Sequence, residues 1–223
     1  DVARKIAHEI KNPLTPIKLG AERLKKFNNL LSEDKSKHDQ TVNMILKQVE
    51  DIKHLIDEFS SFSRMPSPKL KRIDLFLFIK HYLESFEVSY PKVSLVLRNT
   101  QKLNFFILAD EKQLRQVLGN LIKNSYESFV EPKKNHSFIE MEIKKNELYV
   151  EISIIDNGSG INEEIKDKIL EPYYTTKVNG TGLGLFVSYG IIQNHHGNIE
   201  VESKLNMGTT FTIRLPITEV NNT

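Results

Sequence analysis

The first residues that could carry out chemistry stand near the start of the chain. His8 and Glu9 lie between Ile6 and Ile10, in a segment with helical spacing of apolar residues. A neutral imidazole is a competent nucleophile at pH 7. Glu9 is the adjacent base, which would accept the Nδ1 proton and leave Nε2 free to attack. A solvated histidine beside a surface carboxylate is the alternative interpretation of the same two residues.

Two glycine-bearing segments in the second half of the chain are suited to a nucleotide. Asp156 follows a predicted strand, and Gly158 and Gly160 come directly after it. A carboxylate at a strand end can accept a hydrogen bond from an amino group such as that of adenine, and glycines let a ligand approach the backbone. A simple turn is the alternative. The second segment, Gly180-Thr-Gly-Leu-Gly-Leu185, opens a predicted helix whose N–H groups could hold phosphate.

A pair of asparagines adds a possible metal ligand. Asn120 and Asn124 are four residues apart in a predicted helix and therefore share one face. Amide oxygens can ligate Mg²⁺, which prefers oxygen donors. Solvated surface amides are the alternative, and each of these segments is weak evidence when taken alone.

The order of the segments is far more specific. Asn-x₃-Asn, Asp-x-Gly-x-Gly, Pro172-Tyr-Tyr-Thr-Thr-Lys177, Gly-x-Gly-x-Gly and Gly208-Thr209 together resemble the ATP-binding domain shared by histidine kinases, gyrase-type ATPases and Hsp90, over about residues 74–217. The resemblance implies ATP and Mg²⁺ as cofactors. Asp156 would take the adenine amino group, Asn124 would ligate Mg²⁺, and the segment from Tyr173 to Thr181 would be the ATP lid. The residues implied to bind the nucleotide are Asn120, Lys123, Asn124, Asp156, Gly158, Gly160, Thr176, Lys177, Gly180, Thr181, Gly182, Leu183, Gly184 and Thr209.

One position separates the classes within that superfamily. Its ATPases place a glutamate four residues before the metal asparagine, as a base for water, whereas this chain has Asn120. An amide is no general base at pH 7. The domain is therefore expected to bind ATP without hydrolysing it quickly, and to need another acceptor for the phosphoryl group.

The acceptor is expected at the other end of the chain. His8-Glu-Ile-Lys-Asn-Pro-Leu14 resembles the phosphoacceptor box of sensor histidine kinases. The resemblance implies catalytic roles for His8 and Glu9, and Asn12 matches a motif that dephosphorylates the partner response regulator. Pro13 should kink the helix just after the acceptor, since proline is unfavourable within a helix.

The resemblance extends along residues 7–24 and 57–66 to the NtrY group of nitrogen-regulation sensor kinases. It implies a response regulator receiver domain of the NtrX type as the partner. Glu127 is a departure, because many histidine kinases carry lysine three residues after the metal asparagine. Lys123 and Lys177 are the two candidates for supplying that charge. Asn206 also occupies a position often taken by glycine.

The element that must present His8 is a helical hairpin. Apolar spacing predicts helices over residues 2–31 and 38–64, joined by a polar loop at 32–37. One hairpin cannot cover two apolar stripes, so we expect a homodimer in which two hairpins form a four-helix bundle. Packing of the stripes on the rest of the same chain is the alternative. Two prolines, Pro66 and Pro68, stop the second helix.

The nucleotide residues require a second domain with mixed periodicity. Strands are predicted at 93–98, 105–108, 138–143, 148–155, 199–203 and 209–215, and helices at 75–89, 111–129, 163–170 and 183–195. This order indicates an α+β sandwich in which helices cover one face of a sheet. The predicted organisation is a hairpin at 1–65, a linker at 66–73 and an ATP-binding domain at 74–218.

Composition excludes several other classes. The 223 residues carry a formal net charge of only +2, which argues against a nucleic-acid partner. With no cysteine, disulfides, thiolate metal sites and a cysteine nucleophile are excluded. No apolar run reaches the roughly 18 residues of a membrane span. Because the chain opens without methionine inside a helix, we interpret it as a fragment of a longer protein. The resemblance to sensor kinases implies that the longer protein is anchored in the inner membrane, with this portion on the cytoplasmic side.

Three functions are compatible with these residues. The first is an autophosphorylating kinase that transfers phosphate to His8 and then to an aspartate of the regulator. The second is a regulator phosphatase that uses Asn12 and binds ATP as a conformational signal. The third is a dimeric ATP-binding scaffold without chemistry, against which the presence of His8, Glu9, Asn124 and Asp156 argues.

Overall fold

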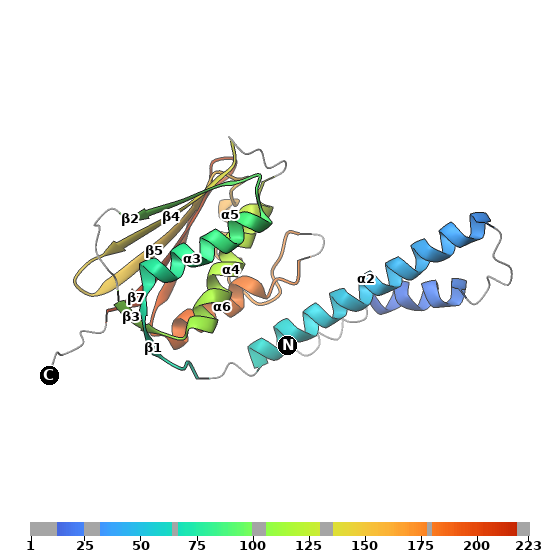
Figure 1. Ribbon diagram of the computed structural model, residues 1–223, viewed down its shortest axis with the longest axis horizontal. Coiled ribbons are helices and arrows are strands. Elements are labelled where there is room, and N and C mark those ends of the chain that lie inside the picture. Colours follow the sequence, from blue (N-terminus) through green and yellow to red (C-terminus); the bar gives the residue numbers. More distant parts are fainter. Residues whose placement is uncertain are drawn as a thin grey trace. The chain divides into compact units, whose positions relative to one another are not determined.

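The computed structural model describes residues 13–24, 32–63, 67–99, 106–129, 136–177 and 180–217. The chain forms two compact units, Asp1–Arg64 and Met65–Thr223. The first unit is helical, and the second combines helices with two sheets (Figure 1). Among the described residues, no helix is long and apolar enough to cross a membrane.

The first unit contains a helix over residues 13–24 and the long helix α2, Ser32–Ser63. The two helices approach closely at Gly20, where an added Cβ would lie 2.9 Å from Met44 Cε and 3.0 Å from Ile45 Cδ1. Large apolar side chains nevertheless remain exposed on both helices, including Leu19 and Leu46. This exposed apolar surface is what the expected four-helix bundle would cover.

The predicted loop at residues 32–37 is wrong, because α2 begins at Ser32. The sequence Ser-Glu-Asp at 32–34 is favourable for a helix start, where serine is a preferred cap and acidic residues suit the first turn. The polar composition of this stretch therefore marks a helix N-terminus. The predicted end of the helix, at residue 64, agrees with the observed end at Ser63.

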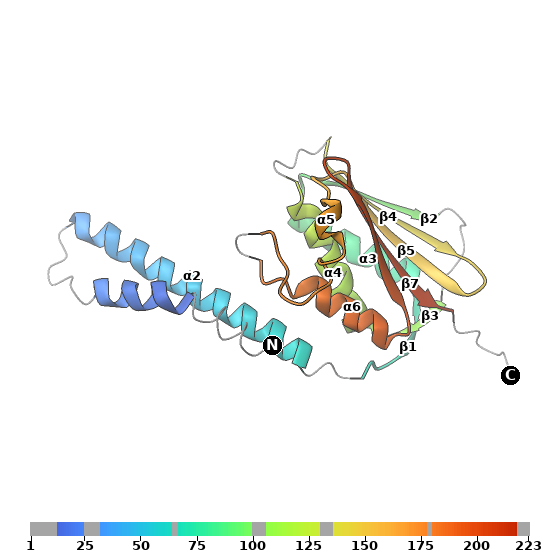
Figure 2. The ribbon, with the colours of Figure 1, turned by 180° about the vertical axis from the view of Figure 1, so that it is seen from behind.

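The second unit is built on a five-stranded sheet in the order β2-β4-β5-β7-β6. β2 and β4 are parallel, and the other neighbours are antiparallel. Helices α3, α4 and α6 lie on one face of this sheet (Figures 1 and 2). The strands are β2 Ser94–Asn99, β4 Phe138–Lys145, β5 Tyr149–Asp156, β6 Asn198–Lys204 and β7 Gly208–Pro216, and the helices are α3 Leu75–Ser89, α4 Glu111–Glu127, α5 Glu163–Lys166 and α6 Gly184–Asn194.

The alternation of burial along the strands explains this layering. Every second residue of β5 is buried, as is every second residue of β7 from Thr209 onward, since successive side chains of a strand point to opposite faces. The inner face packs against the apolar face of α4. The fully buried side chains there include Leu114, Leu118, Leu121, Ile122, Met141, Ile143, Ile152 and Ile154. The predicted α+β architecture with helices on one face of the sheet is confirmed.

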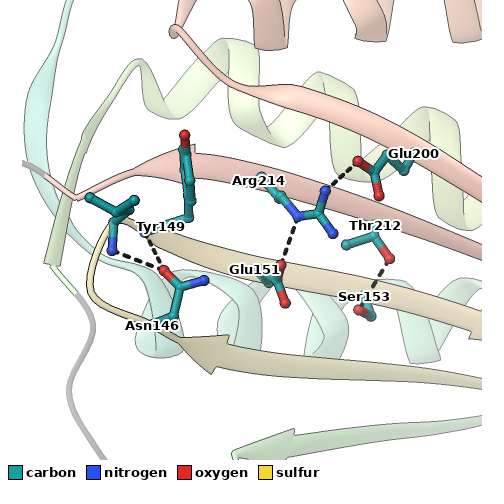
Figure 3. A network of polar contacts seen from close by, with 8 residues as sticks. Asn146, Tyr149, Glu151, Ser153, Glu200, Thr212 and Arg214 are labelled. Carbon is teal, nitrogen blue, oxygen red and sulfur yellow. Dashed lines mark hydrogen bonds and ion pairs between the residues drawn. The ribbon is translucent and has the colours of Figure 1, made fainter.

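The opposite face of the sheet is polar. Arg214 on β7 donates from Nε to Glu151 Oε1 at 2.7 Å and also pairs with Glu200 on β6 (Figure 3). Ser153 and Thr212 form a cross-strand hydroxyl pair at 3.4 Å. Such pairs between neighbouring strands stabilise a face that remains in water.

Two parts of this unit differ from the predicted elements. A second, two-stranded sheet joins β1, Lys71–Asp74, to β3, Phe106–Ala109, so that residues 71–73 belong to an antiparallel ladder. Helix α5 spans only four residues of the predicted 163–170. Beyond it, Lys168 N and Glu171 N bond to carbonyls three residues earlier, so the chain continues as turns.

Candidate functional site

The site is centred on Asp156, the last residue of β5, whose side chain is buried with 3% exposure. Its Oδ1 accepts hydrogen bonds from Gly158 N at 2.9 Å and Thr209 N at 3.3 Å. Burial raises the pKa of Asp156 above its ordinary value, while these hydrogen bonds oppose the rise. The two backbone donors fix the carboxylate plane, so the second oxygen, Oδ2, has a defined direction.

Two serines that the sequence analysis did not single out contribute to this centre. Ser128 Oγ lies 3.4 Å from Asp156 Oδ1. Ser125 acts in the same direction as the backbone donors, because it lowers the pKa of Asp156. Ser125 is buried on α4 and is four residues after the buried Leu121. The signal that could have identified Ser125 is this helical spacing, which places it on the inward face beside the end of β5.

The glycines around Asp156 accommodate the protein's own backbone and side chains. Gly160 has φ of 66°, and an added Cβ would lie 2.1 Å from Lys204 O. At Gly158, a Cβ would lie 1.7 Å from Ser128 Oγ. Both glycines are therefore required by packing, in addition to the ligand access expected from the sequence.

Thr209 lies on the far side of the same centre, in β7. Its Oγ1 is 2.9 Å from Ser203 Oγ on β6. Ser203 also donates to Gly208 O at 2.9 Å and accepts from Ile161 N at 2.8 Å. This serine thus joins the ends of β6 and β7 to the segment that follows Asp156.

Helix α4 connects Asp156 to the glycine segment through Asn120. The Nδ2 of Asn120 donates to Gly184 O at 3.0 Å and to Ser188 Oγ at 3.1 Å, both in α6. Asn120 therefore lies at the start of α6, where its amide braces two helices. Its expected place beside the phosphates stays a prediction. An amide engaged as a donor in this way cannot act as a base for water.

The glycine segment opens α6 as predicted. Gly182 has φ of 68°, and its carbonyl accepts from Tyr173 N at 2.9 Å. Leu183 is the N-cap residue, and because its side chain has no acceptor, the first N–H groups of the helix receive no side-chain cap from it. Such N–H groups are suited to an anion. Thr181 Oγ1 accepts from Leu183 N at 3.4 Å, which shapes the turn into the helix.

The segment between Tyr173 and Thr181 contacts α4 through Lys177. Its Nζ donates to Asn124 Oδ1 at 2.9 Å and to Glu127 Oε2 at 2.5 Å. Lys123, the other candidate for the missing charge, lies 3.8 Å from Glu127 Oε1. Gly180 N closes the turn on Lys177 O at 3.2 Å, while Thr176 is exposed.

The residues present suit Mg²⁺. Asn124 Oδ1 and the Glu127 carboxylate are oxygen donors, the kind that this ion prefers, and together they already contact one cationic group. The predicted catalytic residues His8, Glu9 and Asn12 lie outside the described residues. Their roles stay predictions.

Comparison with known families gives the class to which this fold and site belong. Residues 109–219 match the histidine kinase-, DNA gyrase B- and HSP90-like ATPase family. Residues 1–68 match the His Kinase A (phospho-acceptor) domain. The second unit is thus an ATP-binding domain of this class, and it follows a phospho-acceptor domain in one chain.

Individual relatives narrow the class to a group. The nitrogen regulation protein NtrY of Azorhizobium caulinodans is 40% identical over 90% of this chain and 26% of its own length. An NtrY-like sensor histidine kinase of Rickettsia bellii is 35% identical over 99% of this chain and 36% of its own length. The chain belongs to the NtrY group of two-component histidine kinases, of which it carries the core. It spans between about a quarter and a half of the length of the curated relatives it matches.

Solved structures agree with this placement. The histidine kinase ThkA, determined in complex with the response regulator protein TrrA, matches with a TM-score of 0.77 and 26% identity over 97% of this chain and 61% of that chain. Full-length ShkA in complex with AMPPNP matches in fold, with a TM-score of 0.69 and 22% identity over 96% of this chain and 46% of that one.

Proposed function

We propose that this chain binds Mg-ATP, phosphorylates its own His8 and passes the phosphoryl group to an aspartate of a response regulator. The observation that carries the proposal is the arrangement around α4. One helix brings together the buried carboxylate of Asp156, the amide oxygen of Asn124 and the uncapped start of α6. At the same time Asn120 replaces the base that hydrolysis would need.

Each group has a role in the proposed reaction. Asp156 accepts the adenine amino group, and the first N–H groups of α6 bind phosphate oxygens. Asn124 and Glu127 supply oxygens for Mg²⁺, which neutralises charge on the triphosphate when bound. His8 Nε2 forms a bond to the γ-phosphorus as the bond to the bridging oxygen breaks and ADP leaves. Glu9 accepts the Nδ1 proton.

The partners follow from the same class. The phospho-acceptor domain supports a homodimer, and the solved complex of ThkA with TrrA supports a response regulator partner. We propose that the regulator is of the NtrX type, which is the partner that resemblance to the NtrY group implies. The NtrY relatives match nearly the whole of this chain. The longer protein is proposed to be anchored in the inner membrane, with this portion on the cytoplasmic side.

A second candidate activity is dephosphorylation of the regulator. Asn12 follows Glu9 at the spacing of the phosphatase motif, where its amide would orient the attacking water. Both activities can reside in one chain, and Asn12→Ala separates them. This variant should retain label on His8 while it slows loss of phosphate from the regulator.

The deciding experiment uses radiolabelled Mg-ATP with the purified chain and its His8→Gln and Asn124→Asp variants. Label that is labile to acid, stable to alkali and absent from both variants supports the histidine kinase. His38→Gln is the matched control, because His38 is a partly exposed histidine on α2. ATP binding without label in the unaltered chain contradicts autophosphorylation and favours the phosphatase or scaffold function.

A further inference from the structure

An ion pair lies at the edge of the proposed ATP site, between the lid segment and α4. Lys177 Nζ is 2.5 Å from Glu127 Oε2 and 2.9 Å from Asn124 Oδ1. Lys177 lies 50 positions after Glu127 and 53 positions after Asn124 in the chain. The Lys177 and Glu127 side chains are 39% and 37% exposed, so water screens the pair only in part.

The two oxygens form one cation site. Asn124 and Glu127 are three residues apart on α4 and therefore share a face of the helix. Their oxygens contact the same ammonium group, which is a compact cation with only donor hydrogens. An amide oxygen and a carboxylate are also ligands that Mg²⁺ prefers. One position thus suits either of two cations, but the repulsion between them prevents both from occupying it.

We propose that Asn124 and Glu127 form a cation site with two alternating occupants. The Lys177 ammonium fills it when no nucleotide is bound, and Mg²⁺ takes it over when Mg-ATP binds, which releases Lys177 to the phosphates. The first occupant follows from the structure alone, and the second rests on the proposed function. Glu127 would then be a second metal ligand and the residue that positions the lid lysine.

A cation held between Glu127 and the triphosphate would allow a carboxylate at this place. A negative charge beside a triphosphate is unfavourable unless a cation lies between them. Glu127 should therefore weaken binding of metal-free ATP and strengthen binding of Mg-ATP. The ratio of the two affinities is the quantity that this residue controls.

Limited digestion with trypsin tests the first occupant without nucleotide. Trypsin cleaves after a lysine whose side chain can enter its specificity pocket, so the ion pair should protect the bond after Lys177. Glu127→Gln removes this partly exposed ion pair. We therefore expect the variant to be cleaved after Lys177 about three times faster than the unaltered chain. Glu111→Gln is the matched control, since Glu111 also lies on α4 and pairs with Arg115 at 3.2 Å. Equal rates of cleavage after Lys177 in the Glu127 variant and the unaltered chain would overturn the proposal that the Lys177 ammonium occupies the site.

Binding of a fluorescent ATP analogue tests the second occupant, with and without Mg²⁺. We expect Glu127→Gln to bind the analogue more tightly than the unaltered chain does in EDTA. The factor by which Mg²⁺ increases the affinity should fall about tenfold, because the variant lacks one charged metal ligand. Glu127→Lys should raise binding in EDTA further. An unchanged enhancement in Glu127→Gln would overturn Mg²⁺ as the second occupant. Absence of ATP binding in the unaltered chain would refute the proposed function, whereas the trypsin result would still decide the first occupant.

Discussion

Replacing Asp156 by asparagine should weaken ATP binding while it stabilises the fold. The change removes a buried charge and keeps an oxygen that Gly158 N and Thr209 N can use as their acceptor. Because these donors fix the oxygen at the Oδ1 position, the new NH₂ group occupies the Oδ2 position. A donor then faces the adenine amino group, which is itself a donor.

The size of the binding loss follows from that mismatch. A hydrogen bond to a charged group contributes roughly 1.5–3 kcal/mol, and an unmatched buried donor costs a similar amount. We expect the Kd for Mg-ATP to rise by roughly 10- to 150-fold, towards the upper end because both effects act together. The fold itself keeps the two backbone hydrogen bonds.

The effect on stability has the opposite sign. Burial raises the pKa of Asp156 above its ordinary value of 3.8. Below that value the folded and unfolded chains both bind the proton, and the group contributes no difference. As the pH rises from the ordinary value to the raised pKa, the unfolded chain loses its proton while the folded chain still holds it, so the free energy of unfolding falls. Asp156→Asn lacks this loss, and its stability relative to the unaltered chain should increase as the pH rises above 4.

Calorimetric titration with Mg-ATP and thermal melts between pH 4 and pH 7.5 measure both effects. Asp167→Asn is the matched control, because Asp167 is an exposed aspartate at the end of α5. Binding within about threefold of the unaltered chain would refute Asp156 as the adenine acceptor. A stability difference that does not change with pH would refute the electrostatic argument.

Three backbone and packing changes give further tests by thermal unfolding. Gly182→Ala should destabilise the second unit by about 2 kcal/mol or more and weaken ATP binding, because the Cβ would lie 2.4 Å from Tyr173 C; unchanged melting would contradict the packing argument. His196→Gly should stabilise it by about 1 kcal/mol, because His196 has φ of 58° after the end of α6, and a lower melting temperature would contradict this. Gly20→Leu should cost about 1–3 kcal/mol, because an added Cβ would already lie 3.0 Å from Ile45 Cγ1 and Cδ1 and the larger side chain must displace them; unchanged melting would contradict this.

The sequence was sufficient for elements whose residues repeat at a regular period. The alternation in β5 and the apolar face of α4 predicted a strand and a helix that the structure confirms. The start of α2 was missed because a polar run is compatible with either a loop or a capped helix N-terminus. The ladder between β1 and β3 was also missed, because pairing of short strands depends on partners far along the chain.

His195 also shows the difference between what a local pattern predicts and what depends on a distant partner. His195 and His196 directly precede Gly197, and this local sequence indicates no partner for either histidine elsewhere in the chain. The structure adds that His195 is buried, contacts Ile191 O through Nδ1 at 2.8 Å and accepts from Asp110 N through Nε2 at 2.9 Å. That last partner is 85 residues away, and no local pattern indicates it.

For the site, the sequence determined which residues could take part, and the tertiary structure decided which of them meet. The order of the motifs was enough to single out Asp156, Asn124 and the glycine segment, because chemistry depends on residue type and local spacing. It left Lys123 and Lys177 as equal candidates beside Glu127. Folding places Lys177 Nζ 2.5 Å from that carboxylate and Lys123 Nζ 3.8 Å from it. Hydrogen bonds act over a few ångströms of space, and only the folded chain sets those distances between residues remote in sequence.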